Sequence, residues 1–266
     1  MKLILAVVGV LGFFVMNVSA NLPAGWIDAP FGLYTLGLEG GSWFDDATTV
    51  TVSGSGQGFG GSPPSTDGGR YVFRRLQGDC ELVADVPLLS REILNDDARA
   101  GLLIRSSGDR HDRFAGLMRQ PGTETEPARL RFQHRSAKGT NSGSQTPVAG
   151  MAQGTTNYLS NYDMPVIRMR LVRQGSKLYG YLSTNAAETA WFKAYDATIT
   201  LGEDVLAGLF VNRADVRQVE IMTNTFSNVA VRELVTATRN ETGDRRVVDW
   251  ARSEEHTSEL QSRQVI

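Results

Sequence analysis

Polar and apolar residues alternate in two segments of the chain, RLRFQHR from position 129 and VIRMR from position 166. In a β-strand such alternation places the arginines on one face and the apolar residues on the other. Guanidinium groups bind carboxylates and sulfates through paired hydrogen bonds, so we predict that the arginines bind acidic glycans if both segments share one sheet. Pairing with carboxylates on neighbouring strands is the alternative. The predicted ligand-binding residues are Arg129, Arg131, Gln133, Arg135, Arg168 and Arg170, with Tyr158 and Tyr162 of the intervening segment as stacking platforms for sugars.

Charge is unevenly distributed along the chain. Residues 21–98 contain 4 basic and 11 acidic residues, whereas residues 99–173 contain 12 basic and 5 acidic ones. The whole chain has a net charge of −2. A nearly neutral chain is a poor partner for nucleic acid, because binding to the phosphate backbone needs a basic surface. We therefore expect no nucleic-acid partner and locate the positive charge in the middle third.

The elements that must position these arginines are short strands. Segments at period two recur along the chain, for example TVTVS from position 49, CELVADV from 80 and KLYGYLS from 177. Stretches rich in Gly, Asn, Asp, Ser and Pro separate them, as expected for turns. More than ten such segments predict an all-β protein with two antiparallel sheets or a barrel. The predicted core residues are Leu130, Phe132, Ile167, Met169 and Leu171.

Several sequence blocks occur in the order found in one superfamily. They include LPAGW from position 22, YVFRRLQGDCELVADV from 71, ARAGLLIRSS from 98, RHDRFAGL from 110 and NTFSNVAV from 224. These blocks resemble the concanavalin A-like lectin/glucanase superfamily, in the form of secreted bacterial modules that accompany carbohydrate-active catalytic domains. The resemblance covers residues 22–234. It implies a two-sheet antiparallel jelly-roll sandwich whose partner is a polysaccharide or a cell-surface glycan.

The sequence favours a secreted, non-catalytic module that binds carbohydrate or another cell-surface partner, and a structural envelope protein without a small ligand is a third option. A jelly-roll glucanase of this superfamily would carry a Glu-x-Asp-x-x-Glu pattern on one strand, and the chain has no such pattern. Glu81 and Asp85 share one strand face, but Val83 lies between them, and such a pair is more often part of a solvated surface. The alternative function is a glycoside hydrolase or polysaccharide lyase with an unrecognised site on the concave face.

The remaining candidates for chemistry have ordinary structural explanations. His134 alternates with Leu130 and Phe132, which predicts a half-buried histidine rather than a catalytic base. His111 lies in a loop, where we expect a structural hydrogen bond. We expect no cofactor. A structural calcium ion stays an open alternative to simple turns for three clusters of oxygen donors in loops, which are Asp45 with Asp46, Asn95 to Asp97, and Asp109 with Asp112.

Cys80 is the only cysteine of the chain, so no internal disulfide can form. Its segment alternates, with Leu82, Ala84 and Val86 on the same face. We predict a buried and unreactive thiol, because a free cysteine packs as a small hydrophobic residue.

Both ends of the chain are expected to lie outside the folded domain, which we place at 21–235. Residues 1–20 have the features of a secretory signal peptide, with Lys2, an apolar run from Leu3 to Met16 and a small residue, Ala20, at the end. We expect cleavage before Asn21, a secreted or periplasmic location, and no membrane span in the mature chain.

The other end contains RSEEHTSELQS from position 252, which resembles the translation of a sequencing adapter. We therefore treat 252–266 as an artefactual tail without a packed role. Residues 236–251 are expected to form a polar linker or the start of a lost region, which leaves room for a downstream domain.

Overall fold

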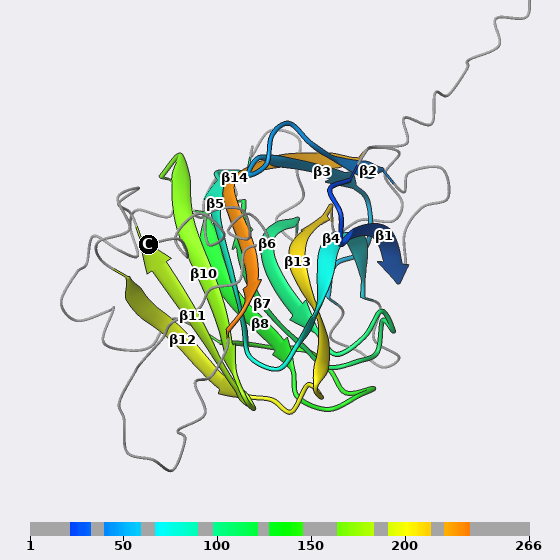
Figure 1. The fold of residues 1–266 in the computed structure, drawn as a ribbon, viewed down its shortest axis with the longest axis vertical. Helices are drawn as coiled ribbons and strands as arrows, with labels where there is room; N and C mark the ends of the chain where they lie inside the picture. Colours follow the sequence, from blue (N-terminus) through cyan, green and yellow to red (C-terminus); the bar gives the residue numbers. More distant parts are fainter. Residues whose placement is uncertain are drawn as a thin grey trace, which may run out of the picture.

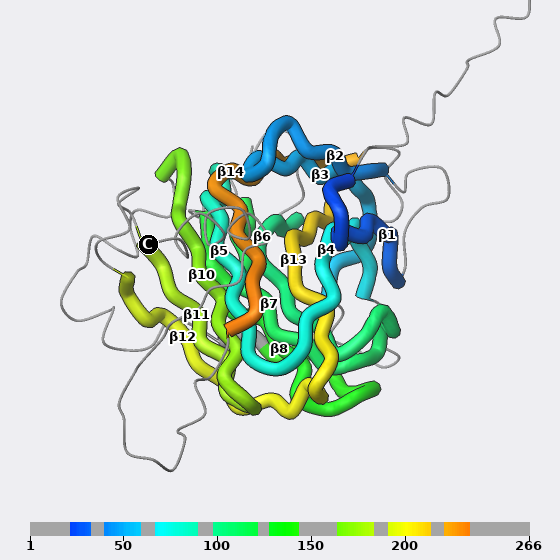
Figure 2. Tube along the Cα trace, in the orientation of Figure 1, coloured from blue at the N-terminus to red at the C-terminus, as the bar shows by residue number. Residues whose placement is uncertain are grey.

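The described residues form two antiparallel sheets of seven strands each, which enclose a shared hydrophobic core (Figure 1). The trace of the chain in Figure 2 follows the same two layers. The predicted all-β sandwich of two antiparallel sheets is therefore confirmed. The computed structural model describes residues 22–32, 40–59, 67–89, 98–121, 128–145, 164–183, 191–213 and 221–234.

Sheet 1 has the strand order β1-β4-β13-β6-β7-β8-β9, and every neighbouring pair is antiparallel. We call the face that points away from the shared core its outer face. The strands are β1 (Trp26–Gly32), β4 (Gly68–Gln77), β13 (Asp204–Asn212), β6 (Arg99–Arg105), β7 (Phe114–Gln120), β8 (Arg129–Arg135) and β9 (Gly143–Gln145).

Sheet 2 has the strand order β12-β11-β10-β5-β14-β3-β2 and is also antiparallel throughout. The predicted hairpin between β10 and β11 is confirmed, and Gly175 in its turn has a φ of 58°. The strands are β12 (Phe192–Thr198), β11 (Lys177–Ser183), β10 (Val166–Gln174), β5 (Cys80–Pro87), β14 (Met222–Glu233), β3 (Val50–Gly54) and β2 (Gly41–Phe44).

Strand β14 changes partner along its length. Residues 222–226 pair with β3, and residues 227–233 pair with β5. The register shifts between Ser227 and Ala230, and Asn228 within the shift has a φ of 51°, in the left-handed region that asparagine tolerates. Such a bulge bends a strand. In Figure 1 the first half of β14 runs with β3 and β2 across the top of the sandwich, and its second half lies beside β5.

The shared core consists of the apolar side chains that alternate along the strands of both sheets. The five predicted core residues belong to it and are at most 6% exposed, so this prediction is confirmed. Phe132 of β8 stacks on Tyr195 of β12 with ring centroids 5.4 Å apart, which ties one sheet to the other. Burial of each such large side chain stabilises the fold by roughly 1.5–3 kcal/mol.

A second apolar cluster covers part of the outer face of sheet 1. Phe59, in the segment that follows β3, stacks on Phe114 of β7 at 4.3 Å and approaches Phe210 of β13 at 4.8 Å. Residues 55–59 therefore lie over this face and bury it. The cluster comprises Phe31, Phe59, Tyr71, Phe73, Leu103, Phe114, Met118, Leu206 and Phe210.

Several predicted segments lie outside the described residues. They are the signal peptide (1–20), the segment 236–251, the tail (252–266), Tyr158 and Tyr162, and the candidate calcium loop from Asn95 to Asp97. Within the described ranges, no helix has the length and apolar character that a membrane span requires.

Candidate functional site

Three neighbouring strands of sheet 1 are rich in arginine and contain no acidic residue. The sequences RAGLLIR of β6, FAGLMRQ of β7 and RLRFQHR of β8 hold six arginines and no Asp or Glu. Arg119 points toward the core side, where its guanidinium donates to the carbonyl oxygens of Val86 (3.0 Å) and Met164 (2.7 Å). The other five arginines lie on the outer face, because side chains alternate along a strand. Any carboxylate that pairs with them comes from another segment.

Asp67, just before β4, pairs with two of these arginines. Its carboxylate accepts two hydrogen bonds from Arg135, at 2.6 and 2.7 Å, and lies 3.5 Å from a nitrogen of Arg105. All three side chains are buried. Burial lowers the pKa of Arg105, and the charge of Asp67 opposes that shift. Arg135 therefore has a structural role, although the sequence predicts it as a ligand-binding residue.

Arg131, two residues before Gln133 on the same face of β8, has a neutral partner. Its Nε donates to the Oε1 of Gln120 on β7, and this is the only polar partner of the guanidinium within the described part of the chain. Arg131 is half-buried, whereas Gln120 is buried. Among the described residues, no carboxylate therefore compensates the charge of Arg131.

Further amide side chains lie on the same outer face as Arg131. The Nε2 of Gln133 donates to the Oγ of Ser142 at 3.0 Å and lies 3.5 Å from the carbonyl oxygen of Phe59. The register pairs Gln120 with Arg129, and Arg99 with Asn212. We call this group the arginine corner. Its members are Arg99, Gln120, Arg129, Arg131, Gln133 and Asn212.

Gly58 fixes the segment above the corner. Its φ of 80° is one that side-chain-bearing residues rarely adopt. A Cβ at this position would lie 2.7 Å from the Nδ2 of Asn212 and 3.2 Å from a nitrogen of Arg99. The backbone of 55–59 therefore packs directly on the polar side chains of the corner.

The arginines of β10 have a different environment. The Nε of Arg170 donates to Glu81 of β5 at 2.6 Å, and Arg232 of β14 binds the other carboxylate oxygen of Glu81. The Glu81 side chain is 1% exposed, so two guanidinium groups enclose it. Arg168 lies 3.6 Å from Asp85, whose second oxygen accepts a hydrogen bond from Asn228 at 2.7 Å. Arg168 and Arg170 are thus paired with carboxylates, whereas Arg173 at the end of β10 donates to the backbone carbonyl oxygens of Gly175 and Glu203.

The two predicted arginine segments do not form one strip. β8 belongs to sheet 1 and β10 to sheet 2, so their arginines lie on opposite outer faces of the sandwich. The premise that both share one sheet is therefore wrong. Alternation fixes which side chains share a face of a strand, but it carries no information on which sheet the strand joins.

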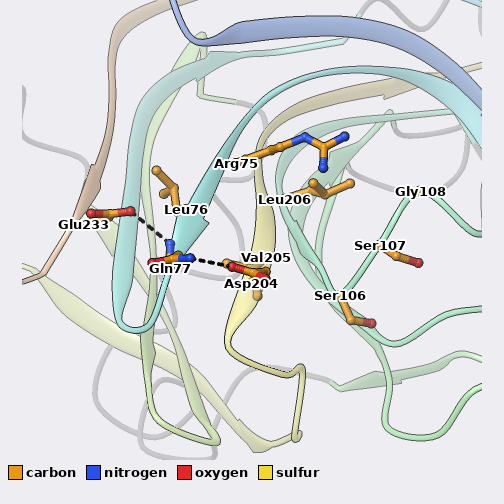
Figure 3. Close-up of a pocket in the computed structure, with 10 residues that line it drawn as sticks. All are labelled: Arg75, Leu76, Gln77, Ser106, Ser107, Gly108, Asp204, Val205, Leu206 and Glu233. Atoms are coloured by element: carbon orange, nitrogen blue, oxygen red, sulfur yellow. Dashed lines mark hydrogen bonds between the residues drawn. The ribbon is translucent and has the colours of Figure 1, made fainter.

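A cleft of about 740 Å³ lies at another part of the molecule (Figure 3). Its floor contains Leu76, Val205 and Leu206. Gln77 lies between two exposed carboxylates, because its backbone N–H donates to Glu233 and its Nε2 donates to Asp204. The lining residues are Arg75, Leu76, Gln77, Ser106, Ser107, Gly108, Asp204, Val205, Leu206 and Glu233.

The other sequence candidates have structural partners. His134 is half-buried as predicted, and burial lowers its pKa. The Nε2 of His111 accepts a hydrogen bond from the Nε of Arg110 at 3.0 Å. Cys80 is buried and free, and burial raises its pKa to about 12, which confirms the predicted unreactive thiol.

The described candidate calcium ligands are engaged in turns. Asp46 accepts hydrogen bonds from the backbone N–H groups of Thr48 and Thr49. Asp109 pairs with Lys138, and Asp112 accepts from Ser107. Among the described residues, no group of three or more His, Cys, Asp or Glu side chains is placed to hold a metal ion.

No family model matches the chain. No curated protein matches it either. Among solved structures, a functionally unknown protein from Saccharomyces cerevisiae has a TM-score of 0.51 at 13% identity, covering 74% of this chain and 98% of that one. Its likeness supports the fold alone.

Two further solved structures are similar to the chain with lower TM-scores. An alginate lyase from Klebsiella pneumoniae has a TM-score of 0.48 at 12% identity, covering 81% of this chain and 96% of that one. Lectin I-B4 from Griffonia simplicifolia has a TM-score of 0.42 at 9% identity, with the same two coverages. The arginine corner is therefore interpreted from its own contacts.

Sequence reasoning missed Gln120 and Asp67. Gln120 ends the segment FAGLMRQ and shares one strand face with Phe114 and Met118. The period of the strand could therefore have predicted the face on which Gln120 lies. Asp67 follows a stretch rich in Gly, Ser and Pro without any periodicity, and its partner Arg135 is 68 residues away. No local signal connects those two residues.

Proposed function

We propose that this protein is a non-catalytic module that binds carbohydrate, and that an anionic glycan binds at the arginine corner of sheet 1. The observation that carries the proposal is the neutral partner of Arg131. No carboxylate of the described residues pairs with this half-buried guanidinium, so its remaining N–H donors and its charge can serve a ligand. On sheet 2, Glu81 and Asp85 already occupy the arginines.

The chemistry of the corner fits a carboxylated or sulfated sugar. Arginine presents its N–H groups in a planar fork that matches the oxygens of such groups. An exposed ion contact is worth roughly 0.2–1 kcal/mol, so a site with few such contacts is weak. We expect a dissociation constant on the order of micromolar to millimolar.

We also propose a secreted or periplasmic location, in which a polysaccharide or cell-surface glycan would meet the module. The support is the signal-peptide pattern of residues 1–20. Fractionation of cells that express the full chain tests this, with the mature protein expected outside the cytoplasm and beginning at Asn21.

A glycoside hydrolase or polysaccharide lyase is the alternative function. A hydrolase needs two carboxyl groups roughly 5–10 Å apart that are free to act on the sugar. Glu81 and Asp85 are enclosed by arginine and asparagine side chains instead. The exposed Asp204 and Glu233 at the cleft keep the hydrolase alternative open.

Affinity electrophoresis distinguishes these functions. We would run the purified chain in gels that contain polygalacturonate, dextran sulfate or neutral dextran, with bovine serum albumin as the reference. The proposal predicts retardation by the two acidic polymers, weaker retardation in 0.5 M NaCl, and no fragments after long incubation. Retardation by dextran alone contradicts the proposal, and release of reducing ends or unsaturated products establishes the enzymatic alternative.

A further inference from the structure

Trp43 is an exposed tryptophan on the edge strand β2 of sheet 2. It is 41% exposed, and the only other large hydrophobic residues that are exposed in the described part of the chain are Val166 and Ile221. Tryptophan is highly buried on average, since its ring carries a large apolar area. An exposed indole on a regular strand therefore needs an explanation beyond folding.

The other described tryptophans have covered rings. Trp26 packs edge-on against Phe44 with centroids 5.1 Å apart, and the guanidinium of Arg170 lies 5.9 Å from the ring of Trp191. Within the described ranges, no aromatic ring or cation stacks on Trp43. None of the described rings or cations therefore competes with a ligand for the face of this indole.

Two rows of hydroxyl groups lie next to Trp43. The register aligns Trp43 with Thr51 of β3, which aligns with Thr225 of β14, and the two threonine hydroxyls are 2.9 Å apart. In the second row Ser53 and Thr223 are register partners with hydroxyls 2.5 Å apart. Thr223 and Thr225 are exposed, so this ledge offers hydrogen-bonding groups to solvent.

Gly41 leaves room on the ledge. It aligns with Ser53 in the second row, two residues from Trp43 on the same face. A Cβ built at Gly41 would meet no atom within 4 Å, so the space beside the indole is open. We call this surface the hydroxyl ledge. It consists of Gly41, Trp43, Thr51, Ser53, Thr223 and Thr225.

The chemistry of the hydroxyl ledge selects an uncharged sugar. None of its six residues is charged, and the nearest carboxylate contact is Asp45, which accepts a hydrogen bond from Thr51 at 3.0 Å. Such a surface offers an anion no countercharge, and the carboxylate of Asp45 would repel one. A pyranose ring has an apolar face of C–H groups and a rim of hydroxyls, which match an indole and a row of threonines.

We propose that the hydroxyl ledge is a second glycan site, at which a neutral sugar ring stacks on Trp43 and hydrogen-bonds to Thr223 and Thr225. Three neighbouring strands span about 10 Å, so the ledge accommodates a short stretch of a neutral oligosaccharide. The site uses no residue of the arginine corner. It is therefore independent of the anionic ligand proposed for sheet 1.

Isothermal titration of the full chain with maltohexaose, cellohexaose and xylohexaose tests the ledge. We expect at least one of these neutral probes to bind and to change tryptophan fluorescence. Trp43→Ala should weaken binding at least tenfold, and Thr225→Val, which keeps the side-chain shape, should weaken it several-fold. Val166→Ala removes exposed apolar surface elsewhere and should bind like the parent chain.

The outcomes separate this site from the arginine corner. Arg131→Ala should leave the binding of neutral probes unchanged, and Trp43→Ala should leave the binding of polygalacturonate unchanged. Circular dichroism would confirm that each variant is folded. Failure of all three probes to bind the parent chain, or equal affinity of the parent, Trp43→Ala and Thr225→Val, overturns the ledge proposal without touching the proposal for sheet 1.

Discussion

The arginines of β8 and β10 look alike in sequence and differ in their surroundings. Both strands alternate arginine with core residues, and β10 presents Arg168 and Arg170 on its outer face as β8 presents Arg129 and Arg131. β10 has β5 as a neighbour, which supplies Glu81 and Asp85. β8 lies between β7 and β9, and neither of these strands contains an acidic residue.

The comparison shows that neighbouring strands decide what an arginine on a sheet face can do. Cross-strand pairs of opposite charge stabilise a sheet, and they use donors of the arginine and acceptors of the carboxylate. On sheet 2 the carboxylates of β5 pair with Arg168 and Arg170, which gives these arginines a structural role. On sheet 1 such pairs join Asp67 to Arg135 and Arg105, and Asp28 of β1 to Arg70 of β4, whereas no carboxylate of the described residues pairs with Arg131.

Removal of Asp67 should have the largest effect on stability. Asp67→Ala leaves Arg105 and Arg135 buried without their carboxylate, and breaking a buried pair in this way costs roughly 3–5 kcal/mol. Urea denaturation followed by tryptophan fluorescence measures the loss. Lys138→Ala is the control, because its pair with Asp109 is exposed and its loss should cost less than about 1 kcal/mol. If Asp67→Ala lowered the free energy of unfolding by less than about 1 kcal/mol as well, the structural role assigned to Arg135 would be wrong.

Neutralisation of Glu81 should allow the arginines of sheet 2 to bind an anionic polymer, as proposed for Arg131 of sheet 1. Glu81→Gln leaves Arg170 and Arg232 without a countercharge while it keeps the shape of the side chain. We expect a loss of roughly 1–3 kcal/mol of stability and stronger retardation in dextran sulfate gels. Asp196→Asn, at an exposed pair with Lys193, is the control for a change of net charge. Equal retardation of both variants would show that local compensation by Glu81 does not matter.

Acid should weaken the loop that supports Arg135. Burial alone would raise the pKa of Asp112, but hydrogen bonds from Ser107 and the N–H of Arg113 outweigh it and lower the pKa to about 2. A lowered carboxyl pKa contributes stability that is present above the usual value of 3.8 and is lost as the pH falls toward 2.

Thermal unfolding between pH 6 and pH 2.5 measures this contribution. Asp112→Asn should be less stable than the parent chain at pH 6, and the difference should shrink as the pH falls below 4. A difference that stays constant over this range would mean that the Asp112 charge is not the source of the stability.

The alternation of polar and apolar residues predicted those features of the fold that are set within a single strand, namely which side chains point inward and which point outward. It identified Phe132 and Met169 as core residues and placed Cys80 in the interior, because the period of a strand fixes which side chains point inward. It also placed Arg129 and Arg131 on one outer face. These predictions need no knowledge of the partner strands.

The rest depends on contacts between distant segments. The sheet to which β10 belongs is set by its pairing with β5, and Glu81 is 89 residues away from Arg170. Trp43 occupies a strand of only four residues, too short for a period to stand out. Both the compensation of charge on sheet 2 and the exposure of Trp43 therefore required the three-dimensional arrangement.

The central claim is that the binding of anionic glycans requires Arg131, which has no carboxylate partner among the described residues, and not the ion-paired Arg168. The most direct test is isothermal titration of an oligogalacturonate into the Arg131→Ala and Arg168→Ala variants at 20 mM and 200 mM NaCl. We expect Arg131→Ala to bind several-fold more weakly at the lower salt concentration, with the gap shrinking at the higher one because exposed charges are screened within ~10 Å at 0.1 M salt. Arg168→Ala should match the parent chain. Equal affinity of the two variants, or a larger loss for Arg168→Ala, would contradict the claim.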